Sequence, residues 1–369
     1  MFEGFDLAGP LPRGMTVLEA SAGTGKTWTI ANLVARYVAD GLRLPELLVV
    51  SFSRAATAEL RDRVRSRLVE VADHLERVLP NPAAAASPEA GTDDPVLALL
   101  ADGDRPRLAE RRGRLLAALT EFDAATIATI HGFCQHVLGG VGLAGDVDHD
   151  ASLLQDQAEL VEAVVDDLLV RRFLRRADQP VSRRDLLAIA RAVVANPDAA
   201  IVPEHADDPT TRLRVELAHS VRAEVDRRKR TAAVLSYDDL LTRLAATLHH
   251  PHLGPAACRR LRAHFKVALI DEFQDTDPVQ WDIVSQLFAT GGSTLVLIGD
   301  PKQAIYSFRG ADVYAYLAAT ARAEVQRTLL VNWRSDGRLL DAYNVLFDRA
   351  VFGDDRIRYR PIDVAPAHR

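Results

Sequence analysis

Lysine and cysteine are scarce in this chain of 369 residues. The two cysteines, Cys134 and Cys258, are too few for a disulfide framework, a four-cysteine zinc site or an iron–sulfur cluster. Only four of the 45 basic residues are lysines, so arginine is the default cation. A lysine kept in such a chain indicates a position that needs a compact point charge rather than a planar fork. Lys26 and Lys302 lie in motif-like segments, whereas chance placement explains Lys229 and Lys266 equally well.

Long apolar runs are also missing, and none approaches the length of a membrane span. The start, MFEGFDLAGPLPRG, is acidic and broken by proline, which is unlike a secretory signal. We therefore expect a cytoplasmic protein that does not contact a membrane. The net charge of −6 argues against a coat of nucleic acid. The basic runs at 171–176 and 226–230 are either solvated helix faces, which we favour, or local binding surfaces.

Four short apolar runs end in polar or small residues, which is typical of buried parallel strands. They are LLVVSFS (47–53), KVALIDE (266–272), TLVLIGD (294–300) and TLLVNWR (328–334). An α/β fold is therefore expected, with its chemistry at the carboxyl ends of the strands. Residues 80–106 are rich in Pro, Ala, Gly and Asp and indicate a surface excursion, and residues 146–248 have the periodicity of a helical insertion.

The segment EASAGTGKTWTI at 19–30 predicts a strand, a small-residue loop and a helix. Ala20 stands where the phosphate-loop pattern has its first glycine, but Gly25, Lys26 and Thr27 are in register. In that geometry backbone N–H groups face an anion, Lys26 reaches the outer phosphates, and the Thr27 hydroxyl ligates Mg²⁺. The alternative is a flexible turn before a helix.

Two acids, Asp271 and Glu272, directly follow the apolar run at 266–270. The first carboxylate can hold Mg²⁺ and the second can orient and deprotonate an attacking water. The alternative role of such a pair is a helix N-cap.

Gln303 follows the next predicted strand, and an amide there can contact both a γ-phosphate and the attacking water. Tyr306 and Phe308 come next, beside Arg309. Aromatic rings near arginine suit stacking on single-stranded nucleic acid, although such rings taken alone more often belong to a core.

Six segments in a fixed order resemble the UvrD/Rep helicases of superfamily one, and within them the RecB subunits of RecBCD enzymes. The segments EASAGTGKT, SFSRAATAELRDR, TIHGFC, IDEFQDTDPVQ, IGDPKQAIYSFRGAD and NWRS match motifs I, Ia, Ib, II, III and IV. They span residues 19–335, and an alanine at position 20 is normal for that family.

The resemblance implies ATP and Mg²⁺ as cofactors and assigns a role to each motif residue. Lys26, Glu272, Gln303 and Arg334 would be catalytic, and Thr27 and Asp271 would hold Mg²⁺. The ATP-binding residues would be Ala20, Ser21, Ala22, Gly23, Thr24, Gly25, Lys26, Thr27, Trp333 and Arg334, with Trp333 stacked on adenine. The DNA-binding residues would be Phe52, Arg54, Thr129, His131, Tyr306 and Phe308.

The resemblance also implies a domain plan and a set of partners. Residues 1–145 and 249–325 would form a first RecA-like ATPase domain, 146–248 a helical insertion, and 326–369 the start of a second RecA-like domain. Partners would be single-stranded DNA, duplex ends, and RecC-like and RecD-like subunits. The activity would be 3′ to 5′ translocation in double-strand-break repair and recombination.

The chain departs from the family pattern in three ways. No glutamine ahead of the loop matches the adenine-reading Q motif, and no segment matches motifs V and VI or the RecB nuclease domain. We therefore expect an N-terminal motor fragment that binds nucleotide weakly and unwinds little by itself. Two alternatives are a truncated, non-translocating ATP-dependent DNA-binding protein and a binding or assembly module of a RecBCD-like complex.

Overall fold

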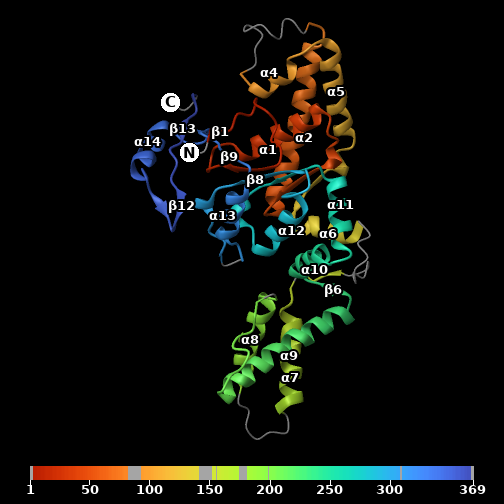
Figure 1. Cartoon of the computed structure of the whole chain (residues 1–369), viewed down its shortest axis with the longest axis vertical. Coiled ribbons are helices and arrows are strands. Elements are labelled where there is room, and N and C mark those ends of the chain that lie inside the picture. The colour runs from red at the N-terminus through yellow and green to blue at the C-terminus, as the bar shows by residue number, and fades with distance from the viewer. Residues whose placement is uncertain are drawn as a thin grey trace. The chain divides into compact units, whose positions relative to one another are not determined.

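The computed structural model describes residues 3–81, 93–140, 152–154, 156–173, 181–197, 199–307 and 310–366. The chain forms two compact units, whose elements are labelled in Figure 1. The larger unit comprises Met1–Cys134 and Ala245–Arg369, and the smaller unit comprises Gln135–Leu244. No helix in these described ranges is long and apolar enough to cross a bilayer.

The larger unit is built from short strands and from helices. The strands of the larger unit are β1 (Glu3–Gly4), β2 (Met15–Glu19), β3 (Leu47–Ser51), β4 (Thr126–Thr129), β7 (Val267–Ile270), β8 (Thr294–Gly299), β9 (Val325–Thr328), β10 (Val331–Asn332), β11 (Val351–Phe352), β12 (Asp354–Arg358) and β13 (Asp363–Val364). Its helices are α1 (Lys26–Asp40), α2 (Arg54–Val78), α4 (Pro95–Ala101), α5 (Arg105–Thr120), α11 (Gly254–His264), α12 (Pro278–Phe288), α13 (Val313–Arg322) and α14 (Gly337–Leu346). Its 3₁₀ turns are η1 (Leu44–Glu46), η2 (Phe122–Ala124), η3 (Phe273–Asp275) and η4 (Pro301–Gln303).

The described residues of the smaller unit form helices and one pair of very short strands. Its elements are β5 (Ser152–Leu153), α7 (Ala158–Phe173), α8 (Arg183–Ala195), α9 (Pro209–Thr231) and β6 (Val234–Leu235). Helices α6 (Ile130–Gly140) and α10 (Tyr237–His249) have residues in both units.

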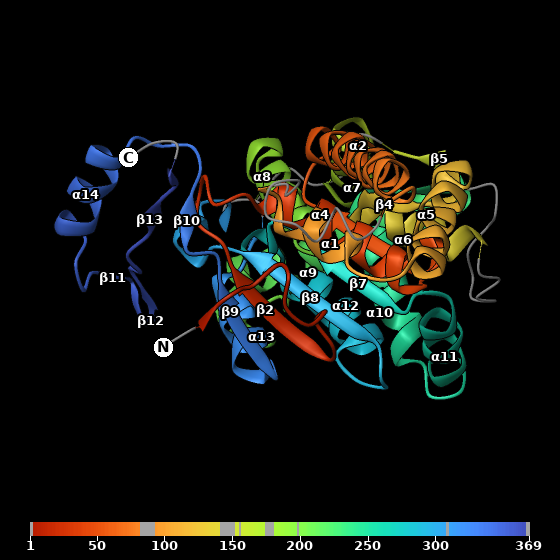
Figure 2. The ribbon, with the colours of Figure 1, turned by 90° about the horizontal axis from the view of Figure 1, so that it is seen from above.

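A seven-stranded parallel sheet in the order β1-β9-β2-β8-β7-β3-β4 organises the larger unit. Figure 2 shows β9, β2 and β8 side by side, with α1 on one face and α13 on the other. The carboxyl ends of parallel strands lie along one edge, so the segments that follow β2, β3, β7 and β8 are neighbours. The α/β class expected from the apolar runs is confirmed.

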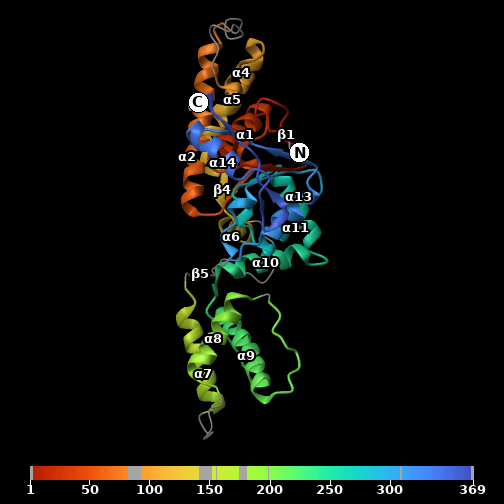
Figure 3. The same cartoon turned by 90° about the vertical axis from the view of Figure 1, so that its left-hand side faces the viewer.

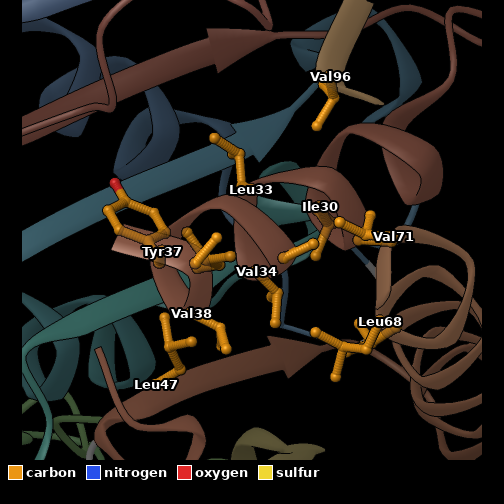
Figure 4. Close-up of a cluster of buried hydrophobic side chains, with 14 of the residues drawn as sticks. Ile30, Leu33, Val34, Tyr37, Val38, Leu47, Leu68, Val71 and Val96 are labelled. Carbon is orange, nitrogen blue, oxygen red and sulfur yellow. The ribbon is translucent and has the colours of Figure 1, made fainter. Parts of the chain in front are cut away.

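The main core lies between the sheet and a layer formed by α1, α2, α4 and α5. Figure 4 shows Ile30, Leu33 and Val34 of α1 in this cluster, to which α2 contributes Leu68 and Val71. On β8, alternate side chains such as Ile298 belong to this core, while the residues between them are equally buried. Because successive side chains of a strand point to opposite faces, the sheet is covered on both sides.

The last sheet strand differs from the prediction. The run at 328–334 was expected to be a strand, and it contains the two-residue strand β10, which pairs with β13. The main sheet instead uses β9 at Val325–Thr328, which pairs with β2 and β1. The ladder ends where the Leu329 N–H donates to the Glu19 carbonyl at 3.0 Å. β9 is only half-buried, because its neighbour β1 is two residues long, and it therefore tolerates Gln326 and Arg327. The sequence of β9, VQRT, contains no apolar run from which a strand could have been predicted.

The expected surface excursion at 80–106 is partly buried. Residues 82–92 lie outside the described part of the chain, but α4 places Val96, Leu97 and Leu100 in the main core. Asp94 caps this helix by accepting from the N–H groups of residues 96 and 97, and Pro95 is its first residue. Aspartate and proline, which indicated a loop, here begin a helix.

The smaller unit overlaps the segment 146–248 that was expected to form a helical insertion. Its helices α7, α8 and α9 lie together in Figure 3, and the core that they share is rich in valine and leucine. The arginines of its basic runs pair with acids of the same unit, as Arg172 does with Glu216 and Arg228 with Asp167. Residues 174–176 of the first run lie outside the described residues.

Truncation of Leu33, which is fully buried, tests the main core. We expect Leu33→Ala to lower the free energy of unfolding by about 2–5 kcal/mol, because it removes apolar contacts and leaves a cavity. All three tryptophans (28, 281 and 333) lie in the larger unit, so urea unfolding followed by tryptophan fluorescence reports on that unit.

The matched control is Leu116→Ala on α5, where the side chain is 39% exposed. Its expected effect is about 0.5 kcal/mol or less. Equal losses for the two variants would contradict the assignment of Leu33 to the core.

Candidate functional site

The loop between β2 and α1 is shaped by glycines at two positions. Gly23 and Gly25 have φ angles of 81° and 87°, in the left-handed region that other residues rarely adopt. A Cβ on Gly23 would lie 2.8 Å from the Asn332 Nδ2 atom, so the close approach of that segment also requires glycine. The Ala20 N–H donates to the Gly299 carbonyl at 2.9 Å, which fixes the start of the loop beside β8.

The loop and the first turn of α1 face a cavity of about 550 Å³. Helix N-termini present backbone N–H groups and a positive potential, which suit an anion. The lining residues are Ser21, Ala22, Gly23, Gly25, Lys26, Thr27, Trp28, Ala31, Glu59, Arg63, Ser66, Arg67, Glu70, Glu272, Gln303, Trp333 and Arg334. The cavity volume falls within the range of roughly 300–1,000 Å³ that small-molecule sites occupy.

Asp271 lies buried at the end of β7. The Ser51 hydroxyl donates to its Oδ2 atom at 3.3 Å, and its Oδ1 atom is buried without a hydrogen-bond partner among the described residues. Burial and the neighbouring charge of Glu272 raise the pKa of Asp271 to about 6. A carboxylate in this position gains from a cation nearby.

Glu272 follows with a φ of 50° and does not cap η3 with its side chain, so the N-cap alternative fails for it. Its Oε2 atom accepts from the Lys26 ammonium at 2.9 Å, across 246 residues of sequence. The Gln274 amide donates to the same oxygen at 2.7 Å. The predicted phosphate-binding lysine and the predicted base are therefore in direct contact.

Gln303 ends η4 and lines the same cavity. Its Nε2 atom donates to the Asp300 carboxylate at 2.9 Å. Asp300 is buried and pairs with the Lys302 ammonium at 2.7 Å, and that ammonium also reaches Glu19 at 2.7 Å. Although burial opposes it, the charge of Lys302 holds the pKa of Asp300 below its usual value. The side chain of Glu19 also accepts from Arg360 at 3.0 Å.

Trp333 and Arg334 reach the cavity because Asn332 fastens their segment to the loop. The Asn332 amide donates to the Ala22 carbonyl at 3.0 Å and accepts from the Arg334 N–H at 2.8 Å. The Trp333 N–H donates to the Gly23 carbonyl at 2.8 Å. The sequence analysis did not identify Asn332 as a site residue, and only its place before Trp333 pointed to it.

A second tryptophan, Trp28, was also missed. It lies in the first turn of α1, lines the cavity and is 42% exposed, while Trp333 is 56% exposed. The Arg67 guanidinium lies 5.8 Å from the centre of the Trp28 ring and is held by Asn32 at 2.8 Å. An aromatic residue directly after Lys26 and Thr27, at the start of a helix, was the available signal.

The residues expected to contact DNA follow the same edge of the sheet. Phe52 follows β3 and stacks on Tyr306, with ring centres 5.4 Å apart. Thr129 lies opposite Ser51 in the β3–β4 register, and its hydroxyl accepts from the Gly132 N–H at 3.2 Å.

The other expected DNA contacts are also placed by the fold, with one exception. Arg54 begins α2, and His131 lies in the first turn of α6. Both make contacts within the protein. Phe308 lies outside the described residues.

Comparison with known proteins gives one family and several relatives. The family model described as "UvrD/REP helicase N-terminal domain" matches residues 7–324. The "RecBCD enzyme subunit RecB" of Mycolicibacterium smegmatis is 45% identical over 354 residues, which cover 95% of this chain and 31% of that protein. The protein of the same name from Mycobacterium tuberculosis is 42% identical over 371 residues, or 99% of this chain and 33% of that protein. The Escherichia coli protein of this name is 29% identical over an alignment of 481 residues, which covers 96% of this chain and 39% of that protein. The chain spans about a third of the length of the two mycobacterial relatives.

Lys302, which is mostly shielded between Glu19 and Asp300, can be tested by a matched pair of substitutions. We expect Lys302→Met to lower the free energy of unfolding by about 3–5 kcal/mol, because it leaves the buried Asp300 carboxylate without its cation, whereas Glu19 keeps Arg360. Lys266→Met, at an exposed position, should change it by about 0.5 kcal/mol or less. Urea unfolding followed by tryptophan fluorescence measures both, and a Lys302 variant as stable as the Lys266 variant would contradict this assignment.

Proposed function

The chain belongs to the UvrD/REP helicase N-terminal domain family, and on that premise we propose that it is the ATP-binding part of a RecB-like DNA helicase motor. The resemblance found in its six motifs is confirmed by the family match and by the RecB relatives. The proposed work of the motor is ATP-dependent translocation, 3′ to 5′ along single-stranded DNA, in double-strand-break repair and recombination. The proposed location is the cytoplasm.

The contact between Lys26 and Glu272 at the mouth of the glycine-shaped loop is the observation that carries this proposal. Lys26 would hold the β- and γ-phosphates while backbone N–H groups of the loop surround them. Glu272, released from Lys26 by the incoming phosphate, would orient the attacking water and accept its proton. Gln303 would contact the γ-phosphate, and Arg334 would stabilise the charge that develops on it.

The proposed Mg²⁺ ligands fit a hard cation. The buried Oδ1 atom of Asp271, which has no hydrogen-bond partner among the described residues, is the kind of oxygen that such an ion takes, and Thr27 lines the cavity. Bound there, the ion would neutralise phosphate charge during transfer.

The two exposed indoles would bind the adenine ring of the nucleotide in the cavity. Trp28 and Trp333 both line it, and flat aromatic faces of this kind stack on a purine ring. Because no Q-motif glutamine precedes the loop, stacking would supply most of the base affinity, and selection of adenine by hydrogen bonds would be weaker.

The DNA track would run along the carboxyl edge of β3 and β4. Phe52 and Tyr306 present stacked rings there, and Arg54, Thr129, His131 and Phe308 would contribute the remaining contacts. Tyr306 is three residues beyond Gln303, so a change at the γ-phosphate would pass directly to the stacked pair. By analogy with its relatives, which are named as RecB subunits of RecBCD enzymes, the partners would be RecC-like and RecD-like subunits at duplex ends.

Nucleotide binding and hydrolysis test this proposal. Wild type should bind a fluorescent ATP analogue, with energy transfer from tryptophan, and single-stranded DNA should stimulate its hydrolysis of ATP. Lys26→Ala should weaken binding by about tenfold or more, because it removes a charged phosphate contact. Glu272→Gln should keep binding but slow hydrolysis by about 10²–10⁴-fold, because the base is lost.

Lys266→Ala provides the control, since Lys266 is exposed and does not line the cavity. It should bind and hydrolyse ATP as wild type does. The proposal fails if Lys26→Ala binds the analogue as tightly as wild type, or if wild type does not bind it.

A further inference from the structure

Gln274 is a buried amide of the segment IDEFQDTDPVQ, and none of the roles assigned to the motif residues falls on it. It lies in η3, two residues after Glu272, and is 2% exposed. Its Nε2 atom donates to Glu272 Oε2 at 2.7 Å and lies 3.4 Å from Asp275 Oδ2. Its Oε1 atom accepts from the Asp300 N–H at 3.0 Å. One side chain thus joins the segment that follows β7 to the segment that follows β8.

The backbone beside Gln274 is built to admit this amide. A Cβ on Gly299 would lie 2.6 Å from Gln274 Oε1 and 3.1 Å from the Phe273 nitrogen. Glycine at position 299 leaves room for the side-chain Oε1 atom of Gln274 to accept from the backbone N–H of Asp300. This close approach, rather than a special φ angle, explains the glycine at the end of β8.

The hydrogen bonds continue from Asp300 to Gln303. The Asp300 carboxylate accepts from the Gln303 amide at 2.9 Å, and Lys302 fixes that carboxylate from the other side. An unbroken path therefore runs from the carboxylate of Glu272 through Gln274 and Asp300 to Gln303. Its two ends are the proposed base and the proposed γ-phosphate contact.

We infer that Gln274 is a positioning residue that holds Glu272 after nucleotide takes Lys26 away from it, and that ties the position of Glu272 to that of Gln303. This inference rests on the proposed function. In the present arrangement Lys26 and Gln274 both donate to Glu272 Oε2. When a phosphate claims Lys26, Gln274 stays as a donor, and its other end is anchored on the Asp300 N–H.

The chemistry of the amide suits this role better than that of any similar side chain. It donates at one end and accepts at the other. A methionine of similar length does neither, and a glutamate would accept from Asp300 but place a second carboxylate against Glu272. The consequence is specific: loss of the amide should impair discrimination of the γ-phosphate, whereas the loop that holds the other phosphates stays intact.

The test compares Kd values for ADP and for a non-hydrolysable ATP analogue, measured with Mg²⁺ by calorimetry on the full chain. Gln274→Met should reduce the preference for the triphosphate by about tenfold, the size of effect expected when a hydrogen bond to a charged group is lost. The Kd for ADP should stay within about twofold of the wild-type value, because Gln274 is not among the residues that line the nucleotide cavity. Gln286→Met on α12, outside the cavity, is the control and should change neither value.

A double-mutant cycle separates positioning from a merely structural role. Gln303→Ala should reduce triphosphate preference in the wild-type background and have little further effect in Gln274→Met. Additive losses, equal losses for ADP and triphosphate, or no loss would each overturn the inference.

If Gln274→Met does not fold, Gly299→Ala serves as a second variant, because its added methyl group would displace the Gln274 amide. It should reproduce the selective loss of triphosphate preference. Equal losses of affinity for ADP and for the triphosphate would again overturn the inference. A wild-type chain that binds neither nucleotide overturns the proposed function, and this inference with it. Wild-type binding without the selective loss overturns the inference alone.

Discussion

The parallel pairing of β2 with β8 is the interaction on which the site depends. It sets Glu19 opposite Gly299, so the loop that follows β2 starts beside the segment that follows β8. β7 pairs with β8 on its other side, which brings Asp271 and Glu272 to the same edge. Segments separated by more than 240 residues of sequence thus meet as neighbours, and the contact between Lys26 and Glu272 follows from this strand order.

Three of the four lysines of this chain form ion pairs that are shielded from solvent. Lys26 pairs with Glu272, Lys302 with Glu19 and Asp300, and Lys229 with Asp239. Each of these ammonium groups is shielded from solvent, whereas the arginines elsewhere pair mainly at the surface. A compact charge with rotatable donors can bridge two carboxylates in a narrow space where a planar guanidinium cannot turn. Lys229, which the sequence alone could not distinguish from chance, follows this rule, and exposed Lys266 does not.

Sequence patterns predicted most of the site but less of its support. All the residues predicted to be catalytic and most of those predicted to bind ATP line one cavity, whereas Asp271 is not among its lining residues. The prediction succeeded this far because loop and strand-end chemistry is local and leaves a local signature. β9 escaped detection because a half-buried strand near the sheet edge has no apolar run, and α4 because its aspartate and proline also occur in loops. Asn332 and Gln274 lie inside the quoted segments NWRS and IDEFQDTDPVQ, but each acts by bridging to a distant segment, so the sequence did not reveal its role.

A crystal structure of the chain with a non-hydrolysable ATP analogue and Mg²⁺ tests the central claim most directly. We predict that the outer phosphates contact the Lys26 ammonium and that the adenine ring lies between Trp28 and Trp333. Glu272 should be separated from Lys26 but still hydrogen-bonded to Gln274. Nucleotide bound elsewhere, or bound in the cavity with Lys26 and Glu272 still paired, would contradict it.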